Sequence, residues 1–376
     1  MRIHAAIGEI PPADWDALAG DNPFLRHAFL NALETTGCAS PKTGWQPAHL
    51  TLEDGDRLIG AMPLYVKSHS YGEFVFDWAW ADAYQRHGLH YYPKLLCAVP
   101  FSPVTGRRLL GEPDALPRLA AAAAALAEER QLSSVHCLFP VASQAEALAA
   151  QGWLVRTDCQ YHWHNRGYRD FDDFLDAFSS AKRKKIRRER RRVAEAGISF
   201  RTLHGDDLDP PLLDAIFRFY RITYFERGRR PYLNREFFET IAEQMGSALV
   251  IFLACHNEEP VGAAICFRGS DTLYGRHWGA DQVFHSLHFE TCYYQGIDYC
   301  IREGLQHFDP GAQGQHKISR GFEPTTTYSA HWIADPEFRE AIADFLSRER
   351  PMMAAYREDA REHLPFKVDP HGAPLD

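Results

Sequence analysis

The stretch that decides the fold spans residues 272–322 and reads TLYGRHWGADQVFHSLHFETCYYQGIDYCIREGLQHFDPGAQGQHKISRGF. Its pattern predicts an aromatic strand at 273–278, a long buried helix at 287–303 and a short strand at 307–309. A polar, glycine-rich loop at 310–317 follows the short strand. Ligand sites of α/β units usually lie beyond the carboxyl ends of strands, where both loops of this stretch begin. We therefore expect an active site at these two loops.

The composition is that of a globular protein with room for two domains, since 376 residues carry 45% hydrophobic and 24% charged side chains. No run approaches the ~18 apolar residues of a membrane-spanning helix. The first residues lack the apolar core of a signal peptide. Eight cysteines have no CxxC spacing, which favours buried thiols over disulfides or zinc, and no histidine pattern indicates a metal site. We expect a cytoplasmic protein.

The net charge of −9 is unevenly distributed along the chain. Nine of the eleven residues from Lys182 to Arg192 are basic and one is acidic, so this helix carries +8 and the rest of the chain −17. Like charges one turn apart repel, so the basic helix needs a counter-anion. An acidic surface of the first domain, a nucleotide-linked precursor and a tRNA stem are the candidates. We favour a ligand phosphate, bound by side chains such as Arg183 and Arg187.

Two hairpins indicate an internal duplication. The pair of strands at 47–53 and 58–67 aligns without a gap on the pair at 248–255 and 260–268, at an offset of 202 residues. Each half has the predicted element order βααβββαβ, which is the order of the GNAT acyltransferase fold. We therefore predict a mixed α/β protein of two tandem GNAT-like domains, at 1–165 and 166–334, the second opening with the basic helix. A helix and tail follow at 335–376.

The first half contains a polar-aromatic segment at 68–92, SHSYGEFVFDWAWADAYQRHGLHYY. A loop of this length inside a compact domain is usually functional. Asp77, Trp78, Tyr84 and Lys94 are therefore candidates for lining a substrate groove. The alternative is a loop that packs over its own domain.

The chain resembles the FemABX-type peptidyltransferases and, more closely, the FemAB-like predicted N-acyltransferases described as peptidoglycan biosynthesis/recognition proteins. The basic helix at 181–198 is similar to their K-x-R-x-x-I-R…G-(I/V) helix, and residues 307–322 are similar to their F-D-x-G…F-K-x-G-F segment. The strings NPFL (22–25), HSYGEFVFDW (69–78), PFSPVTG (100–106) and LHFE (287–290) extend the resemblance over about residues 20–350. It implies transfer of an acyl or aminoacyl group to a small-molecule or peptide amine, such as a peptidoglycan precursor, in a cleft between the domains.

The identity of the acyl donor stays open. GNAT enzymes that use coenzyme A carry Q/R-x-x-G-x-G/A, whose backbone N–H groups bind the pyrophosphate. Neither residues 103–108 nor residues 279–286 match this motif. The resemblance therefore leaves two donors, acyl-coenzyme A or an aminoacyl-tRNA, and we expect no tightly bound cofactor.

Acyl transfer to an amine needs a donor for the oxyanion and a group that takes the proton. The resemblance suggests the backbone N–H of Gly279, beside Trp278, and the side chain of Lys317 as oxyanion donors. His288 and Glu290 begin the long helix; they point about 200° apart, so we expect only one of them to face the substrate.

Other polar side chains of these loops are candidate ligands of the substrate. Arg276 suits a carboxylate or phosphate of the substrate, and the alternative is a structural ion pair. The last loop is framed by Asp309, Gln313, His316 and Arg320.

Two alternative functions use the same features. A non-catalytic binding protein for a cell-wall precursor or another phosphate-bearing ligand would need the cleft and the basic helix, but no role for Lys317. An RNA-binding module would act through the basic helix and show strong salt dependence.

Overall fold

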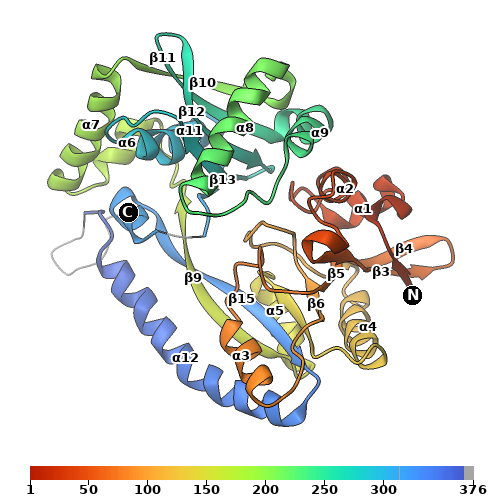
Figure 1. Ribbon diagram of the computed structural model, residues 1–376. Coiled ribbons are helices and arrows are strands. Elements are labelled where there is room, and N and C mark those ends of the chain that lie inside the picture. Colours follow the sequence, from red (N-terminus) through yellow and green to blue (C-terminus); the bar gives the residue numbers. More distant parts are fainter. Residues whose placement is uncertain (313, 368–376) are drawn as a thin grey trace. The chain divides into compact units, whose positions relative to one another are not determined.

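The computed structural model describes residues 1–312 and 314–367, so the expected ligand residue Gln313 lies outside the described residues. The chain forms two compact units (Figure 1). Unit 1 consists of Met1–Cys159 and Thr326–Tyr356, and unit 2 of Gln160–Thr325 and Arg357–Asp376. The chain crosses between them within β9 (Leu154–His164), β15 (Glu323–Ile333) and α12 (Pro336–Glu362). None of the helices in the described residues is long and apolar enough to cross a membrane.

The sheet of unit 2 has the strand order β10, β11, β12, β13, β14, β9. Neighbouring strands are antiparallel except for the parallel pair β13–β14. The further bounds are β10 Ile198–His204, β11 Leu249–His256, β12 Glu259–Arg268, β13 Thr272–Ala280, β14 His307–Asp309, α6 Phe171–Asp176, α7 Ser180–Glu195, α8 Pro210–Phe225, α9 Arg235–Met245, and the 3₁₀ turns η3 Gly205–Asp207, η4 Gly246–Ala248 and η6 Gln315–Arg320.

The long helix of unit 2 extends from Leu287 to Glu303, which confirms the bounds predicted from the sequence. It consists of α10 (Leu287–Phe289), a π-helical segment η5 (Glu290–Tyr294) and α11 (Gln295–Glu303). A Cβ atom on Gly296 would lie 2.4 Å from the ring of Phe308, so this glycine lets the helix pack directly on β14. π-helical segments frequently occur at functional sites, and this one precedes the strand end that carries the candidate site.

Unit 1 contains two sets of strands. One sheet has the order β1, β3, β4, β7, and the other set has the order β15, β8, β6, β5, β2, in which β6 and β8 are parallel. The bounds are β1 Arg2–His4, β2 Trp45–Pro47, β3 His49–Asp54, β4 Arg57–Met62, β5 Leu64–Lys67, β6 Lys94–Cys97, β7 Leu110–Gly111, β8 Ser134–Leu138, α1 Pro12–Ala19, α2 His27–Thr35, α3 Trp78–Arg86, α4 Ala115–Glu129, α5 Ala142–Ala150, η1 Ile7–Glu9 and η2 Pro41–Thr43. The alanine-rich helix α4 packs on this core through Leu119 and Ala123.

Two expectations for unit 1 were wrong in detail. The strand expected at 58–67 is broken at Pro63 into β4 and β5, which pair in different sheets. Proline cannot donate a ladder hydrogen bond, so it ends the first pairing. The segment at 68–92 is not a loop throughout, because α3 occupies Trp78–Arg86.

The two hairpins share their register as well as their sequence pattern. Leu52 pairs with Gly60 and Ala254 with Gly262, and the pairing shifts directly after Leu52 in β3 and after Ala254 in β11. Both the pairing and the bulge therefore repeat at the offset of 202 residues. Each hairpin is followed by a parallel strand pair with a helix between its strands, β6–α4–β8 in unit 1 and β13–long helix–β14 in unit 2.

Candidate functional site

Three neighbouring strands of unit 2 bring Arg276, Asp309 and His162 together where the parallel pair ends. The last paired residues of β13 and β14 are Tyr274 and Asp309, and β9 lies on the other side of β14. Arg276 Nη1 lies 4.0 Å from Asp309 Oδ2, and His162 Nε2 lies 3.7 Å from Asp309 Oδ1. The side chains of Arg276 and Asp309 are only 5% and 2% exposed.

A β-bulge positions Arg276. Along the β12–β13 ladder His277 pairs with Ile265 and Gly275 with Cys266, so Arg276 is the extra residue between them. Bulges often lie beside active sites, where they redirect a side chain. Here the bulged residue Arg276 lies two residues beyond Tyr274, the last residue of β13 that pairs with β14.

Lys317, on η6, completes this group, which we call the Lys317 cluster (His162, Arg276, Asp309 and Lys317). Lys317 is 1% exposed, and its Nζ donates a hydrogen bond to the carbonyl of Gly311 at 2.5 Å. The N–H of Gly311 in turn donates to Asp309 Oδ1 at 2.8 Å. The glycine loop therefore connects the lysine to the carboxylate.

The Lys317 cluster carries more positive than negative charge. Burial lowers the pKa of Lys317 to about 8, with Asp309 opposing and Arg276 adding to the shift. Burial also lowers the pKa of His162, so this imidazole is neutral near pH 7. Asp309 Oδ2 accepts no hydrogen bond from a described residue. The Lys317 cluster thus holds two cations and one carboxylate, a balance that suits a substrate oxygen on which negative charge develops.

Arg320 supports the η6 turn through several contacts. It donates to both carboxylate oxygens of Glu189 at 3.0 and 3.1 Å, to Tyr294 Oη at 3.0 Å and to the carbonyl of His316 at 2.8 Å. Its guanidinium lies 3.5 Å from the centre of the Phe289 ring. These partners occupy its donors, so the geometry gives Arg320 a positioning role for the turn that carries Lys317.

His288 and Glu290 have different surroundings. His288 packs edge-on against the rings of Trp278 and His316, at centroid distances of 5.6 and 6.1 Å, and burial lowers its pKa to about 4. Glu290 Oε1 instead accepts hydrogen bonds from Arg190 of α7 at 3.2 Å and from Gln295 at 2.8 Å. Burial raises the pKa of Glu290, although Arg190 opposes the shift. His288 thus packs against aromatic rings and Glu290 pairs with Arg190, and the expectation that only one of them faces the substrate stays a prediction.

Gly279 has a packing reason to be glycine. A Cβ atom at this position would lie 1.8 Å from the carbonyl oxygen of Phe219, because the backbone of α8 lies against β13. The neighbouring carbonyl of Trp278 accepts a hydrogen bond from Thr223 Oγ1 at 2.6 Å. The expected role of the Gly279 N–H as an oxyanion donor stays a prediction.

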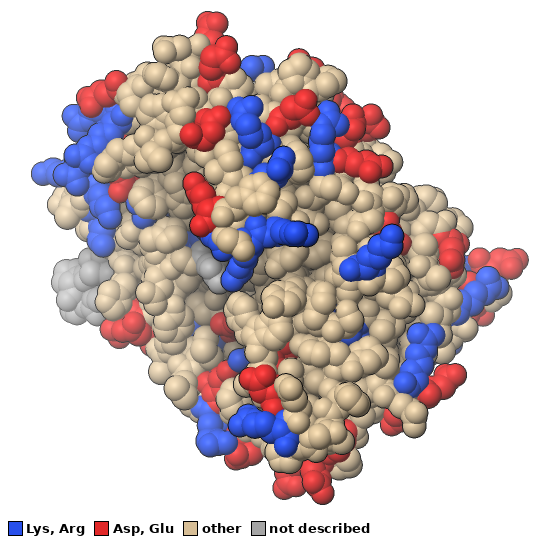
Figure 2. Space-filling model, in the orientation of Figure 1, with Lys and Arg blue, Asp and Glu red and all other residues tan. Residues whose placement is uncertain are grey.

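The basic helix α7 obtains part of its counter-charge from its own unit. Arg183 lies 3.3 Å from Asp176 and Arg187 lies 3.0 Å from Asp172, both at the adjacent α6. Exposed Lys184, Arg188 and Arg191 form a stripe along one face, and none of them has an ion pair with a described residue. Figure 2 shows this concentration of basic side chains at the left edge of the molecule, over α7.

The candidates of the first half belong to unit 1 and do not join the Lys317 cluster. Lys94 and Asp77 form a buried ion pair at 2.5 Å. Trp78 is 38% exposed and packs on Tyr71. Tyr84 is buried against Phe338, with 4.0 Å between ring centroids.

Sequence reasoning missed His162 and Glu189. Gln160, His162 and His164 alternate along β9, and a period of two marks one face of a strand, so a polar face was detectable. That this face meets Asp309 depends on the pairing of β9 with β14, far apart in sequence. Glu189 is the lone acid of the basic run, and its burial against Arg320 explains why it is there.

The comparisons with known proteins agree with this architecture. The chain is similar to a crystal structure of FemX, with 12% identity over 91% of this chain and 100% of that one, at a TM-score of 0.55. It is also similar to L-PGS from Bacillus licheniformis, with 11% identity over 89% of this chain and 95% of that one, also at 0.55. These likenesses confirm the expected mixed α/β fold with two GNAT-like halves.

No curated protein matches the sequence. The FemAB-like model, described as peptidoglycan biosynthesis/recognition, matches residues 6–368. The chain therefore belongs to the FemAB-like family.

Proposed function

We propose that this FemAB-like protein is an N-acyltransferase that joins an acyl or aminoacyl group to an amine acceptor at the Lys317 cluster. The observation that carries this proposal is the excess of buried cations where β13 and β14 separate: Arg276 lies 4.0 Å from Asp309, and Lys317 is connected to Asp309 through Gly311. Excess positive charge in a buried site stabilises an oxyanion far more than it would in water.

The reaction forms one bond and breaks another. The neutral amine nitrogen attacks the carbonyl carbon of the donor, a C–N bond forms, and negative charge develops on the carbonyl oxygen. Collapse of this intermediate breaks the bond to the donor's oxygen or sulfur, and the proton lost by the amine ends on that leaving group. In this scheme Lys317 neutralises the oxyanion, because with a pKa of about 8 it is mostly charged at neutral pH.

His162 is the proposed proton acceptor. Its imidazole is neutral near pH 7, because burial lowers its pKa, and Asp309 lies 3.7 Å from Nε2. A carboxylate at this distance stabilises the imidazolium that forms when the amine proton arrives. Arg276 Nη1 lies 4.0 Å from the other carboxylate oxygen of Asp309, Oδ2.

The donor is an acyl-coenzyme A or an aminoacyl-tRNA, and both carry phosphates. The stripe of Lys184, Arg188 and Arg191 on α7 supports a phosphate contact with either donor, since its charges lack partners among the described residues. The acceptor is a small molecule or peptide with a primary amine; the family description supports a cell-wall precursor.

The test is amide formation with both donor classes and a panel of amine acceptors, read by mass spectrometry of the products. Arg276→Met should lower the rate about 10²-fold or more, because it removes one cation of the site. The matched control is Arg118→Met, an exposed arginine of α4, which should leave the rate unchanged. If donors or precursors bind but no amide forms, the protein is a binding protein for phosphate-bearing ligands, and the proposal fails.

A further inference from the structure

In the described residues, two pairs of histidines face each other through their Nδ1 atoms, one pair in each unit. In unit 1 the pair is His136 of β8 and His331 of β15, with 2.6 Å between the two nitrogen atoms. In unit 2 the pair is His164 of β9 and His307 of β14, at 3.0 Å. The two pairs differ in their burial and in the partners of their other ring nitrogens, and the proposed reaction uses neither.

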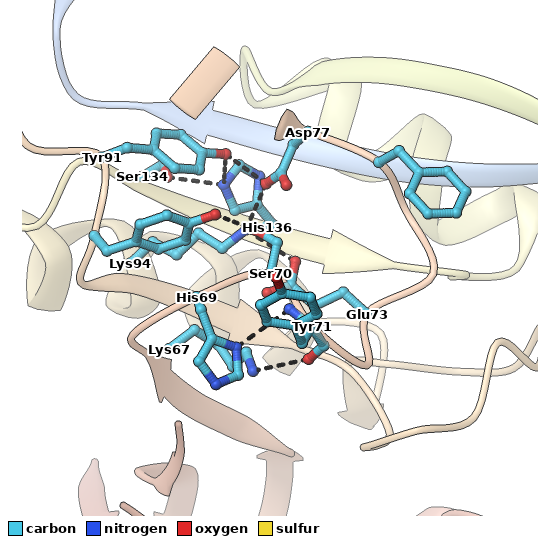
Figure 3. Close-up of polar contacts among 12 residues, drawn as sticks. Lys67, His69, Ser70, Tyr71, Glu73, Asp77, Tyr91, Lys94, Ser134 and His136 are labelled. Carbon is cyan, nitrogen blue, oxygen red and sulfur yellow. Dashed lines mark hydrogen bonds and ion pairs between the residues drawn. The ribbon is translucent and has the colours of Figure 1, made fainter. Parts of the chain in front are cut away.

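The pair in unit 1 is closed to solvent, since His136 and His331 are each 1% exposed. His136 Nε2 lies 2.8 Å from Ser134 Oγ and 3.0 Å from Tyr91 Oη, and Figure 3 shows these contacts. His331 Nε2 lies 2.9 Å from Ser329 Oγ. All four ring nitrogens are therefore used within the fold, and this pair has no position for a ligand.

The pair in unit 2 has the opposite surroundings. His307 is exposed and His164 is half-buried, and neither ring has a second hydrogen bond to a described residue. Arg166, whose charge acts on His164, is paired with Glu323 at 2.8 Å, so its positive charge is balanced. The pair can therefore be reached from solvent, and each ring keeps one nitrogen that no described residue uses.

The strand pairing explains why the two rings meet. His164 and His307 are direct partners in the antiparallel ladder of β9 and β14, although 143 residues separate them in the sequence. The Cβ atoms of such partners lie about 4.5–5.5 Å apart on one face of the sheet, which brings two imidazole rings together. The backbone ladder, rather than a loop, therefore sets the distance between the two nitrogens.

The distance of 3.0 Å between the two Nδ1 atoms fits two ligands of one metal ion. A transition metal lies about 2.0–2.1 Å from an imidazole nitrogen, so two nitrogens at right angles around it are about 2.9 Å apart. The same bond lengths in a tetrahedron place them about 3.3–3.4 Å apart. The pair is thus closer to the right-angle geometry of Cu²⁺ and Ni²⁺ than to that of tetrahedral Zn²⁺. The described residues form no group of three or more ligating side chains, so water fills the other positions.

Metal binding requires the transfer of one proton and a small rotation of the rings. In the hydrogen bond between the two rings, one Nδ1 carries a proton and the other offers a lone pair. When a metal binds, the donor ring gives up its Nδ1 proton to solvent and takes one at Nε2, so that the ring stays neutral. Both Nδ1 lone pairs then turn toward the metal. Neutral imidazole is the form that binds metals.

We propose that His164 and His307 form a two-histidine site for a divalent transition metal ion, with a preference for Cu²⁺ and Ni²⁺ over Zn²⁺. Imidazole suits these ions, whereas Mg²⁺ and Ca²⁺ prefer oxygen ligands and are not bound. A bound ion ties β14 to β9, which matters because β14 is three residues long, pairs with β9 through only two of them and carries Asp309. The inference goes beyond the proposed reaction, since neither histidine belongs to the Lys317 cluster.

The test titrates the metal-free full chain, without an affinity tag, with NiCl₂, ZnCl₂ and MgCl₂ in a calorimeter at neutral pH. We expect one equivalent of Ni²⁺ to bind, more tightly than Zn²⁺, and no heat from Mg²⁺. Ni²⁺ should also raise the Tm, because the unfolded chain does not hold the two ligands together. His307→Asn and His164→Gln should each weaken Ni²⁺ binding about 10²-fold or more. Binding should be unchanged in His90→Asn, an exposed histidine of unit 1, and in His162→Gln.

A spectroscopic signature gives a second measurement. The electron paramagnetic resonance spectrum of the protein with one equivalent of Cu²⁺ should show coupling to two nitrogen ligands, and that of His307→Asn to no more than one. Unchanged Ni²⁺ binding in both His307→Asn and His164→Gln overturns the proposal, as does the absence of Ni²⁺ binding to the wild-type protein. A loss in His162→Gln as large as in His307→Asn would place the metal elsewhere and also overturns it. If the variants do not fold, coupling of wild-type Cu²⁺ to fewer than two nitrogens has the same consequence.

Discussion

Unit 1 and unit 2 each bury one lysine beside carboxylates, and the two lysines are held in opposite ways. Lys94 of unit 1 gives all three protons to Ser70, Glu73 and Asp77, and these carboxylates raise its pKa against the effect of burial. Among the described residues Lys317 of unit 2 donates one hydrogen bond, to the carbonyl of Gly311, and burial lowers its pKa to about 8. The fold therefore stabilises the charge on Lys94 and destabilises the charge on Lys317.

The carboxyl ends of the two parallel strand pairs also differ in how their charged side chains are used. In unit 2 the carboxyl end of β13–β14 carries Arg276 and Asp309, and Asp309 Oδ2 accepts no hydrogen bond from a described residue. In unit 1 the loop after β6 is closed by buried Arg108, which donates to the carbonyls of Leu138 and Val104 at 2.8 and 2.5 Å. Charges that are fully used within the fold stabilise it, whereas charges left over can serve a ligand. The duplicated strand order alone does not show in which half the charges stabilise the fold and in which half they can serve a ligand.

The largest expected effect is on the stability of unit 1. Lys94→Met leaves two buried carboxylates without their cation and should cost about 3–5 kcal/mol of unfolding free energy. Lys317→Met should cost little or stabilise the protein, because it removes a charge that burial disfavours. Urea denaturation of the two variants, with Lys42→Met as an exposed control, measures both. Similar losses in both variants would remove the contrast between the two lysines.

A second effect, about tenfold per pH unit, is expected in the pH dependence of Lys317. As the charged oxyanion donor it loses its proton above pH 8, so turnover should fall on the alkaline side of about 8. The contribution of Lys317 to the free energy of unfolding has the opposite dependence on pH. Between pH 8 and the unfolded value of 10.5 the unfolded chain binds more protons, so stability rises with pH in that window. A pH–rate profile beside a pH series of Tm values for wild-type and Lys317→Met protein tests both signs.

The smallest effect is expected at the surface of α7. Arg188→Ser removes a charge without an ion pair to a described residue, so stability should change by no more than about 0.5 kcal/mol. Binding of a polyanionic donor should nevertheless become less salt-dependent, with the slope falling by about 0.9 for each phosphate that is no longer neutralised. Arg183→Ser, whose charge is paired with Asp176, is the matched control and should change the slope less. Equal changes in slope would mean that the unpaired stripe has no special role.

Much of the fold was predictable because its signals are local. The apolar periodicity predicts the long helix from Leu287 to Glu303, and the Asp54-Gly55-Asp56 turn predicts the first hairpin. The break at Pro63 is equally visible in the sequence, yet the apolar pattern of residues 58–67 continues across the proline and favours a single strand.

The residues that surround Lys317 and Lys94 were less predictable, because they come together through pairings between distant segments. His162 meets Asp309 only because β9 lies beside β14, and His136 meets His331 only because they are opposite residues of β8 and β15. The ion pair of Arg320 with Glu189 spans 131 residues. No local sequence pattern predicts such pairings. Lys317, Arg276 and Asp309 could therefore be predicted as candidates, but the groups that lie next to them could not.

The most direct test of the proposed role of Lys317 is the rate of amide formation by Lys317→Ala, measured in single turnover with whichever donor the wild-type protein uses. We predict a loss of about 10²–10³-fold with an unchanged or higher Tm, because the variant lacks an oxyanion donor but keeps its fold. Lys42→Ala, an exposed lysine of unit 1, should keep the wild-type rate. A Lys317→Ala protein that forms the amide at the wild-type rate would show that Lys317 is not the oxyanion donor.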